Sequence, residues 1–383
     1  MESNHDRMKR ILYVGDAIAL FGGIERVIAD KLNRLTEQGD FKVRLLTTNQ
    51  GSHPLAYPLN PLVEHHDLDI LFHQQYRYSG LKRLWVVRQK HQLFRQRLAA
   101  QIRAFRPDVI VCIRLVLILD VLRVSGEVPV LFESHMSCLC YRFEGLPSWV
   151  RFQIWRRHRA LKHARAVIAL TEGDAEEWRK VNPHVKVIPN VVNLNNTGRL
   201  SDCSSKNVIF VGRYSKQKDV WSLMKIWQLV HQRHPDWTLN LFGDYGDQRD
   251  VLLPEIKKTG ANIVLHDPTA KIGEEYLRSS MLLLTSIYEP FGLVMPEAMS
   301  YGLPVVAFDC PYGPADIITD GVDGFLIKDR NIEDFADKVC RLIEDEGLRR
   351  RMGQAGVESS QRYSAENIMP LWKSLFDSII REK

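Results

Sequence analysis

MLLLTSIYEPFGLVMPEAMSYGLPVVAF, residues 281–308, contains the clearest structural pattern in this chain. It begins with a short apolar run, residues 281–285, which has the length and composition of a buried strand. The chain then turns at Pro290, and residues 293–301 are expected to form a short helix before Pro304 starts the next strand. The pattern predicts strand, turn, helix and strand, which is the repeating unit of a parallel sheet.

The same alternation extends over the rest of the chain in two sets. We expect strands at residues 10–15, 42–47, 108–113, 129–133, 165–170 and 186–188, and then at 207–211, 237–242, 262–266, 281–285, 304–308 and 324–327. Residues 190–205 between the sets are polar and rich in turn formers, which places a linker there.

The expected fold class is α/β, with two Rossmann-like, doubly wound parallel-sheet domains facing a deep cleft. We place the first domain at residues 1–195 and the second at 196–364, because the linker separates the two sets of strands. The last helix, residues 365–383, is expected to cross back to the first domain. Its apolar residues recur at helical spacing.

Composition narrows the class of protein. The 383 residues are 45% hydrophobic and 26% charged, as in a soluble globular protein, and no apolar run approaches the roughly 20 residues of a membrane span. The start of the chain leads directly into a strand without the apolar region of a signal peptide, and the six cysteines are scattered. We therefore expect a cytoplasmic protein with free, mostly buried thiols.

Positive charge is concentrated in the first half of the chain. Residues 1–195 hold 29 Lys and Arg against 19 Asp and Glu, and residues 81–98 and 149–159 mix Trp, Phe and Leu with Lys and Arg at helical spacing. Two interpretations remain open: helices that contact an anionic membrane at the inner face of the cell membrane, or helices packed on their own domain with a solvated basic face. Nucleic acid is a less favoured partner, because no nucleic-acid-binding module is recognisable.

The turn after residue 285 has the chemistry of a phosphate site. Gly292 would let the backbone approach an anion closely, and the amides of Leu293 and Val294 would donate from the first turn of the helix. Glu297, one turn into this helix, could accept hydrogen bonds from ribose hydroxyls, and Glu289 could reach a sugar ring. The alternative is that Glu297 simply complements the helix dipole.

The segment Glu289-Pro-Phe-Gly-Leu-Val-Met-Pro-Glu297, continued by Ala-Met-Ser-Tyr-Gly-Leu-Pro, resembles the signature of the retaining glycosyltransferase family 4, which has the GT-B fold and uses nucleotide-activated sugars. Weaker resemblance covers nearly the whole chain. It implies that Glu289 contacts the transferred sugar, that the amides from Phe291 through Val294 bind the donor phosphates, and that Glu297 binds the ribose.

A second match is Val211-Gly-Arg-Tyr-Ser-Lys-Gln-Lys-Asp219, which resembles the family segment whose Arg and Lys hold the diphosphate. Here these residues are Arg213 and Lys218 after Gly212, with Lys216 as an alternative cation. Two fixed cations would stabilise the charge that develops on the leaving diphosphate. The family usually has Lys-Gly where this chain has Lys218-Asp219.

Weaker resemblances complete the expected site. Gly22 and Gly23 resemble the family's glycine-rich loop in the first domain, and His135 resembles a strand-end His that contacts the donor sugar and phosphate. In the second domain, the turn Gly243-Asp-Tyr-Gly246 and the loop that begins at His266 would line the nucleotide pocket. The catalytic residues implied by the resemblance are therefore Glu289, His135, Arg213 and Lys218.

The sequence also argues against other chemistry. The first domain lacks the Gly-x-Gly-x-x-Gly fingerprint of nicotinamide enzymes, and no Asp-x-Asp motif is placed to hold a divalent ion on the diphosphate, so we expect neither cofactor nor metal. The resemblance favours retention at the anomeric carbon, with a glycan or polyprenyl-diphosphate-linked glycan as acceptor in cell-surface polysaccharide synthesis. Cys310-Pro-Tyr-Gly-Pro resembles members that use UDP-hexoses and UDP-N-acetylhexosamines, and a guanosine donor stays open. Two further alternatives are a sugar-nucleotide epimerase and a non-catalytic binding module of the same fold.

Overall fold

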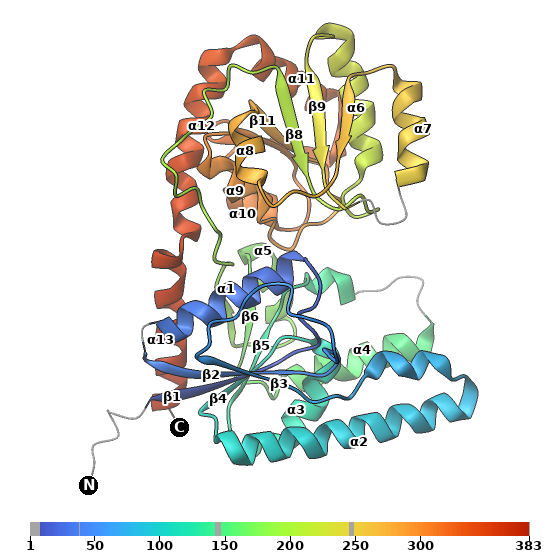
Figure 1. Ribbon diagram of the computed structural model, residues 1–383, viewed down its shortest axis with the longest axis vertical. Coiled ribbons are helices and arrows are strands. Elements are labelled where there is room, and N and C mark those ends of the chain that lie inside the picture. Colours follow the sequence, from blue (N-terminus) through green and yellow to red (C-terminus); the bar gives the residue numbers. More distant parts are fainter. Residues whose placement is uncertain (1–7, 38, 142–146, 245–248, 383) are drawn as a thin grey trace. The chain divides into compact units, whose positions relative to one another are not determined.

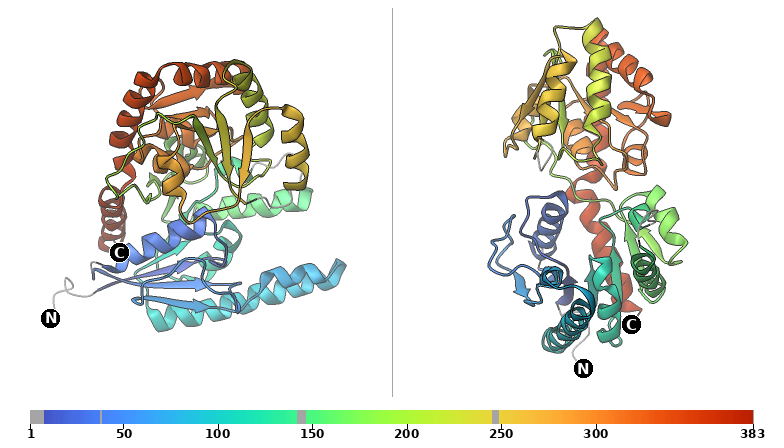
Figure 2. Two further views of the ribbon diagram at one scale, coloured as in Figure 1. Left: turned by 45° about the horizontal axis from the view of Figure 1, so that its top comes forward. Right: turned by 90° about the vertical axis from the view of Figure 1, so that its right-hand side faces the viewer.

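The computed structural model describes residues 8–37, 39–141, 147–244 and 249–382 and divides the chain into two compact units. Unit 1 comprises residues 1–170, 174–191 and 368–383, and unit 2 comprises residues 171–173 and 192–367. In each unit, helices surround one central parallel sheet (Figures 1 and 2). The predicted fold class, two Rossmann-like parallel-sheet units, is confirmed.

The sheet of unit 1 has seven parallel strands in the order β3-β2-β1-β4-β5-β6-β7. Strand order reverses between β1 and β4, so the carboxyl ends of these two strands border a switch point, where open α/β sheets bind ligands. The strands are β1 (Lys9–Val14), β2 (Phe41–Thr47), β3 (Val63–Asp67), β4 (Val109–Cys112), β5 (Val130–Glu133), β6 (Ala166–Ala169) and β7 (Val185–Val187).

Helices cover this sheet, and one of them comes from the far end of the sequence. Trp372 and Phe376 of the last helix are buried, and the Phe376 ring meets Phe41 of β2 edge-on at 5.7 Å between centroids. From Ile368 onward the last helix therefore belongs to unit 1. The helices are α1 (Gly23–Glu37), α2 (Gly80–Phe105), α3 (Ile118–Val124), α4 (Ser148–Leu161), α5 (Glu172–Arg179) and α13 (Ala365–Arg381), with short 3-10 turns at Phe72–Arg77, Leu115–Leu117 and Cys138–Tyr141.

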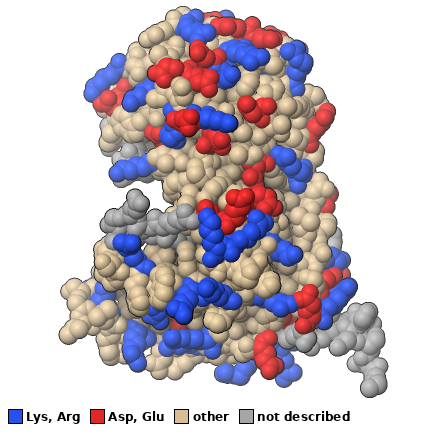
Figure 3. Space-filling view, turned by 180° about the vertical axis from the view of Figure 1, so that it is seen from behind, with Lys and Arg blue, Asp and Glu red and all other residues tan. Residues whose placement is uncertain are grey.

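On one face of the protein, the charged side chains do not form one continuous field (Figure 3). On the face shown in Figure 3, groups of Lys and Arg alternate with groups of Asp and Glu. The excess of positive charge in the first half of the chain must therefore be located helix by helix.

The sheet of unit 2 has six parallel strands in the order β10-β9-β8-β11-β12-β13. Its switch point lies between β8 and β11, which are neighbours in the sheet although two strands separate them in the sequence. The strands are β8 (Asn207–Val211), β9 (Thr238–Phe242), β10 (Ile263–His266), β11 (Met281–Leu284), β12 (Val305–Phe308) and β13 (Gly324–Ile327).

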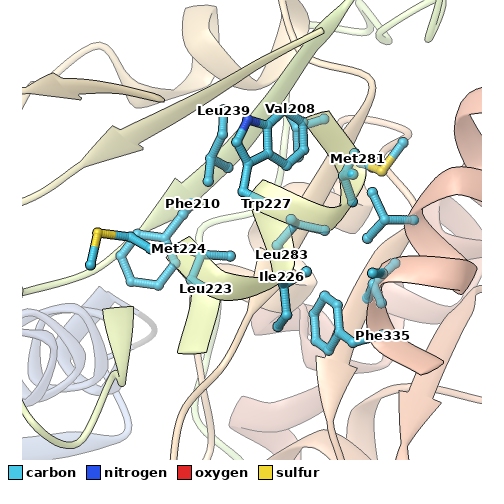
Figure 4. Close-up of a cluster of buried hydrophobic side chains, with 14 of the residues drawn as sticks. Val208, Phe210, Leu223, Met224, Ile226, Trp227, Leu239, Met281, Leu283 and Phe335 are labelled. Carbon is cyan, nitrogen blue, oxygen red and sulfur yellow. The ribbon is translucent and has the colours of Figure 1, made fainter. Parts of the chain in front are cut away.

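A large apolar core holds unit 2 together. Trp227 of α6 is fully buried against strands β8 and β9, and Phe335 of α11 packs on the same cluster (Figure 4). Burial of such side chains contributes about 1.5–3 kcal/mol each, which is enough to keep the strand ends beneath the site rigid. The helices are α6 (Val220–Arg233), α7 (Arg249–Thr259), α8 (Ile272–Leu277), α9 (Val294–Ser300), α10 (Gly313–Ile317), α11 (Ile332–Glu344) and α12 (Glu346–Ser360), with 3-10 turns at Lys328–Arg330 and Gln361–Tyr363.

Most of the expected strands are present, and the one that the prediction omitted is β3. Its sequence, Val-Glu-His-His-Asp, contains a single apolar residue, because β3 is the edge of the sheet and only Val63 is buried. The thiols agree with the expectation: all six cysteines are free and five of them are buried. Among the described residues, no helix is both long and apolar enough to cross a membrane.

Candidate donor site

The segments singled out in the second half of the chain meet at the switch point of unit 2. Arg213 and Lys218 follow β8, Glu289 follows β11, and these two strands are neighbours in the sheet. All three residues therefore lie at the carboxyl edge, where parallel sheets present ligand-binding groups. Two segments about seventy residues apart in the sequence thus form one local site.

An ion pair joins the two segments. The Lys218 ammonium contacts Oε2 of Glu289, and their side chains are only 15% and 9% exposed. The same carboxylate oxygen accepts a hydrogen bond of 3.0 Å from the Ser286 hydroxyl. These contacts fix the orientation of the Glu289 side chain and hold the Lys218 ammonium beside it.

Backbone hydrogen bonds fix the position of Glu289 as well. Its amide donates to the Pro311 carbonyl at 2.7 Å, and its own carbonyl accepts from the amides of Tyr312 at 3.0 Å and Gly313 at 2.8 Å. Gly313 has no room for a side chain, because a Cβ there would lie 2.0 Å from the Phe291 carbonyl oxygen. The turns after β11 and β12 therefore form one interlocked layer.

The turn before α9 has the geometry expected of the anion site. Gly292 has φ +91, and a Cβ there would lie 2.5 Å from Met295 Cε and 2.9 Å from Glu289 Cγ. Helix α9 follows, with Leu293 at its N-cap position. The first amides of a helix have no partner within the helix, so those before Met295, whose own amide bonds back to Gly292, can serve a ligand.

Two further residues of this turn are buried. Phe291 is 3% exposed, and its ring meets Tyr363 edge-on at 5.2 Å, so this residue can offer a ligand its backbone only. Glu297, in the first turn of α9, is 6% exposed. Val294 is the first helical residue, one position later than the sequence pattern predicts.

Glycines bring the strand ends close together. A Cβ at Gly243 would lie 1.9 Å from the Gly212 carbonyl oxygen, and one at Gly212 would lie 3.3 Å from Lys218 Cε. Gly212 thus leaves space for the stem of Lys218. Tyr245 and Gly246 of the expected glycine turn lie outside the described residues.

The remaining expected residues of unit 2 are Arg213 and His266. Arg213 is exposed beyond the end of β8. His266 ends β10, where its ring stacks on Phe242 at 4.3 Å and its Nε2 lies 2.9 Å from the Asn240 side-chain oxygen. These contacts fix the His266 ring within unit 2, and its place beside the nucleotide stays a prediction.

In unit 1, His135 belongs to a buried charged cluster that the sequence pattern did not reveal. His135 lies just past β5, 8% exposed, with Nε2 3.1 Å from Oε1 of Glu133. Glu133 in turn pairs with Lys31 of α1, whose ammonium lies 4.3 Å from the centre of the Trp372 ring. Burial alone would raise the pKa of Glu133, but the charges of Lys31 and His135 outweigh burial and hold that pKa at about 2. Glu133 is therefore an anion beside His135 at every physiological pH.

The switch point of unit 1 also holds a cavity. Gly22 and Gly23 lie at the start of α1, and a cavity of about 260 Å³ opens beyond the ends of β1, β2 and β4. Asp16 and Arg114 line it, with the guanidinium 3.5 Å from the carboxylate and both side chains more than a third exposed. Tyr76, 71% exposed, lines the same cavity.

The sequence pattern missed the residues that join the two donor segments. Ser286, Gln217 and Arg330 all bond to backbone or carboxylate groups of the site. Gln217 lies inside the matching segment of residues 211–219 and Ser286 lies just before the other one, so their polar side chains were a usable signal. Arg330 lies after β13 and has no fixed spacing to either segment, so only the folded structure could identify it.

Comparison with known proteins agrees with this geometry. The model of the family described as Glycosyltransferase Family 4 matches residues 21–196, and the model described as Glycosyl transferases group 1 matches residues 199–359. The two matches lie side by side and together cover most of the chain. The chain belongs to glycosyltransferase family 4, with the GT-B fold.

Sequence similarity to an individual relative covers only part of this chain. Over 190 residues the chain is 36% identical to the amylovoran biosynthesis glycosyltransferase AmsD of Erwinia amylovora, a match that covers 48% of this chain. The same match covers 52% of AmsD, so the chain spans about half the length of that relative. The chain is thus related to enzymes of polysaccharide biosynthesis.

Similarity in fold extends over nearly the whole chain. A mutant of S. aureus TarM in complex with Fondaparinux, alpha-GlcNAc-glycerol and UDP superposes with a TM-score of 0.76 at 16% identity, covering 96% of this chain and 100% of TarM. Anabaena Alr3699/HepE in complex with UDP-glucose gives 0.74 at 20% identity, covering 96% and 99%. At these identities the likeness establishes the fold alone.

Proposed function

We propose that this protein is a retaining glycosyltransferase that moves a hexose or N-acetylhexosamine from a nucleotide sugar to a hydroxyl of a glycan or lipid-linked glycan. The observation that carries the proposal is the Lys218–Glu289 pair at the switch point of unit 2, directly before the Gly292 turn and α9. This arrangement offers a cation and backbone amides to a diphosphate and a carboxylate to a sugar.

UDP is the nucleotide that we propose for the donor. TarM and HepE have been crystallised with UDP or UDP-glucose, and both share the fold of this chain. The resemblance of the segment at Cys310 to members that use UDP-sugars supports the same choice. GDP is the competing nucleotide in the test below.

The reaction that we propose is a front-face substitution. The bond from the anomeric carbon to the diphosphate oxygen breaks while a bond to the acceptor hydroxyl oxygen forms on the same face. The hydroxyl proton passes to the departing diphosphate oxygen. Arg213, Lys218 and the amides at Gly292–Val294 would stabilise the charge on that leaving group, and Glu289 would orient the sugar. His135 as a sugar contact, and independence from metal, stay predictions.

For the acceptor we propose the cavity at the switch point of unit 1. Its exposed Asp16 carboxylate and Arg114 guanidinium can accept from and donate to sugar hydroxyls, and the Tyr76 ring offers a face for stacking. This chemistry suits a carbohydrate better than an apolar molecule.

We further propose that unit 1 attaches to an anionic membrane surface at the cytoplasmic face, where a lipid-linked acceptor would be presented. The first half of α2 exposes Trp85, and α4 exposes Trp149 and Trp155, at 60%, 64% and 52%. Both helices begin at the same end of unit 1 (Figures 1 and 2). The earliest buried residue of α2 is Phe94, which supports the interfacial interpretation over packing against the unit's own core.

The donor site is tested by replacing both cations. Turnover of UDP-glucose, UDP-N-acetylglucosamine and GDP-mannose is measured for the wild type and for the Arg213→Ala/Lys218→Ala double variant. Loss of two cations at the leaving group should lower turnover of the accepted donor by about 100-fold or more. Unchanged turnover would show that the assignment is wrong.

A variant of unit 1 and reactions without acceptor separate the alternatives. Asp16→Asn in unit 1 should keep the affinity for UDP while it lowers transfer to the acceptor, because its cavity serves the acceptor only. An epimerase would convert the donor without any acceptor, and a binding module would bind UDP without turnover. Proton NMR of the product reports retention directly.

A further inference from the structure

The loop that carries Lys218 is bound to the segment after β11 at several points. The Ile287 amide donates to the Gln217 carbonyl at 2.7 Å, and the Gln217 side-chain amide donates to the Tyr288 carbonyl at 3.0 Å. The Thr285 hydroxyl lies 3.0 Å from the carbonyl oxygen of Lys218. The position of the Lys218 ammonium thus depends on how the two segments are held together.

The residue after Lys218 is unusual for its backbone conformation. Asp219 has φ 45 and ψ 57, in the left-handed region that glycine adopts without strain. It caps α6, because its carboxylate accepts from the Ser222 amide at 3.2 Å and from the Ser222 hydroxyl at 2.7 Å. The Asp219 side chain that forms this cap is only 17% exposed. It places a negative charge beside the site that we propose for a diphosphate.

Arg330 supplies the compensating charge. Its guanidinium pairs with Oδ2 of Asp219 and donates to the carbonyls of Ser286 at 2.9 Å and Thr285 at 3.3 Å. The guanidinium lies 4.5 Å from the centre of the Phe308 ring, which restricts it further. One side chain therefore contacts both the loop after β8 and the segment after β11.

We infer that Arg330 is a positioning residue of the donor site: it cancels the charge of Asp219 and holds the Lys218 loop against the segment that bears Glu289. This inference rests on the proposed function, because it concerns binding of a nucleoside diphosphate. Without Arg330, the Asp219 carboxylate is an uncompensated anion that repels the diphosphate at short range.

Rescue by a second substitution tests this role. Arg330→Met keeps the apolar stem and removes the charge, and it should weaken UDP binding about tenfold, the effect of one nearby charge in a partly buried site. Asp219→Asn keeps the cap and the tolerance of the left-handed backbone while it removes the negative charge. The Arg330→Met/Asp219→Asn double variant should recover most of the lost affinity, although the bonds to the two carbonyls are still absent.

The measurement is isothermal titration of UDP, with GDP in parallel, for the wild type, both single variants and the double variant. Arg233→Met is the matched control, since Arg233 forms an ion pair with Asp337 at the far end of α6, and it should leave nucleotide affinity unchanged. Thermal unfolding of each variant separates loss of affinity from loss of folding.

The outcomes are distinct. If the double variant binds as weakly as Arg330→Met, Arg330 contacts the phosphate itself or only supports the fold, and the inference is overturned. The same holds if Arg330→Met binds as the wild type does. If the wild type binds neither nucleotide, the proposed function fails and the inference fails with it.

Discussion

Gly292 shows how much of the donor site depends on one missing side chain. Its φ of +91 is strained for any L-residue, and an added Cβ would collide with Met295 Cε and Glu289 Cγ at 2.5 and 2.9 Å. Either collision would move the turn that presents the amides of α9. The conformation and the site therefore require glycine for two separate reasons.

Gly292→Ala should lower the affinity for UDP by about tenfold or more and destabilise the fold by about 1–3 kcal/mol, because strain adds to the clash. Titration calorimetry and urea unfolding measure the two effects. Gly260→Ala is the matched control, since Gly260 has φ +66 with nothing within 4 Å of an added Cβ. It should show the strain without the loss of affinity, and equal affinities in the two variants would contradict this explanation.

The turn at Gly292 could be predicted residue by residue, because Gly292 and Pro290 are local signals for a turn and Glu289 follows an apolar strand. The contacts of Lys218 could not be predicted in this way. Whether a lysine binds phosphate or a neighbouring carboxylate depends on which strand lies beside it in the sheet, and strand order is not written in any local pattern. Arg330 illustrates the same limit, since it acts on residues from two other segments.

At the scale of elements, a buried ion pair connects α1 to β5. Lys31 and Glu133 are 2% and 1% exposed, and the ring of Trp372 covers the ammonium. Burial lowers the pKa of Lys31, and the attraction of Glu133 offsets part of that shift. Such a pair is costly to break because the partner that remains is a buried charge.

Lys31→Met should therefore destabilise the protein by about 3–5 kcal/mol, measured by chemical denaturation. The Lys31→Met/Glu133→Leu double variant should recover most of that loss, because neither the ammonium nor the carboxylate of the pair is then left buried without its partner. Lys258→Met, which removes an exposed pair with Glu255, should cost less than about 1 kcal/mol. A double variant as unstable as Lys31→Met would show that packing, and not charge, is what matters at this position.

The same pair predicts a dependence on pH. The pKa of Glu133 is about 2 in the folded protein and near its ordinary value of 4.5 when unfolded. Its contribution to stability is thus fully present above about pH 4.5 and is lost as the pH falls toward 2. The difference in stability between the wild type and Glu133→Gln should be constant above about pH 4.5 and should shrink as the pH falls toward 2, as measured by acid titration.

Regular elements were the most predictable part of the fold. Among the described residues, apolar runs located twelve of the thirteen strands to within one residue at each end. The exception, β3, pairs with β2, and four of its five side chains are polar, so no apolar pattern marks it. An edge strand is held in its sheet by backbone hydrogen bonds more than by burial of side chains. Backbone hydrogen bonds leave no apolar pattern in the sequence.

At the scale of the whole molecule, basic and exposed aromatic side chains gather on α2 and α4 of unit 1. Residues 1–195 carry an excess of ten positive charges, and α4 combines Arg156 over Phe152 at 5.9 Å with Arg159 over Trp155 at 5.5 Å. Aromatic rings beside guanidinium groups suit the boundary between lipid headgroups and acyl chains.

Vesicle flotation tests this surface. The wild type should float with phosphatidylglycerol vesicles and much less with phosphatidylcholine vesicles, and added salt should weaken the binding. The Trp85→Ser/Trp149→Ser/Trp155→Ser variant should lose about tenfold or more in binding, because three interfacial rings are removed. Trp221→Ser, at a half-exposed position of unit 2, should float as the wild type does. No preference for the anionic vesicles would rule the surface out.

The position of α13 in the sequence affects how unit 1 folds during synthesis. Unit 1 takes its first strands from the start of the chain and its covering Trp372 and Phe376 from near the other end. While the ribosome is still translating unit 2, the Lys31–Glu133 pair lacks its aromatic cover and Phe41 lacks its ring contact. The nascent unit 1 is thus incomplete, with apolar surface uncovered, until the last helix emerges from the exit tunnel.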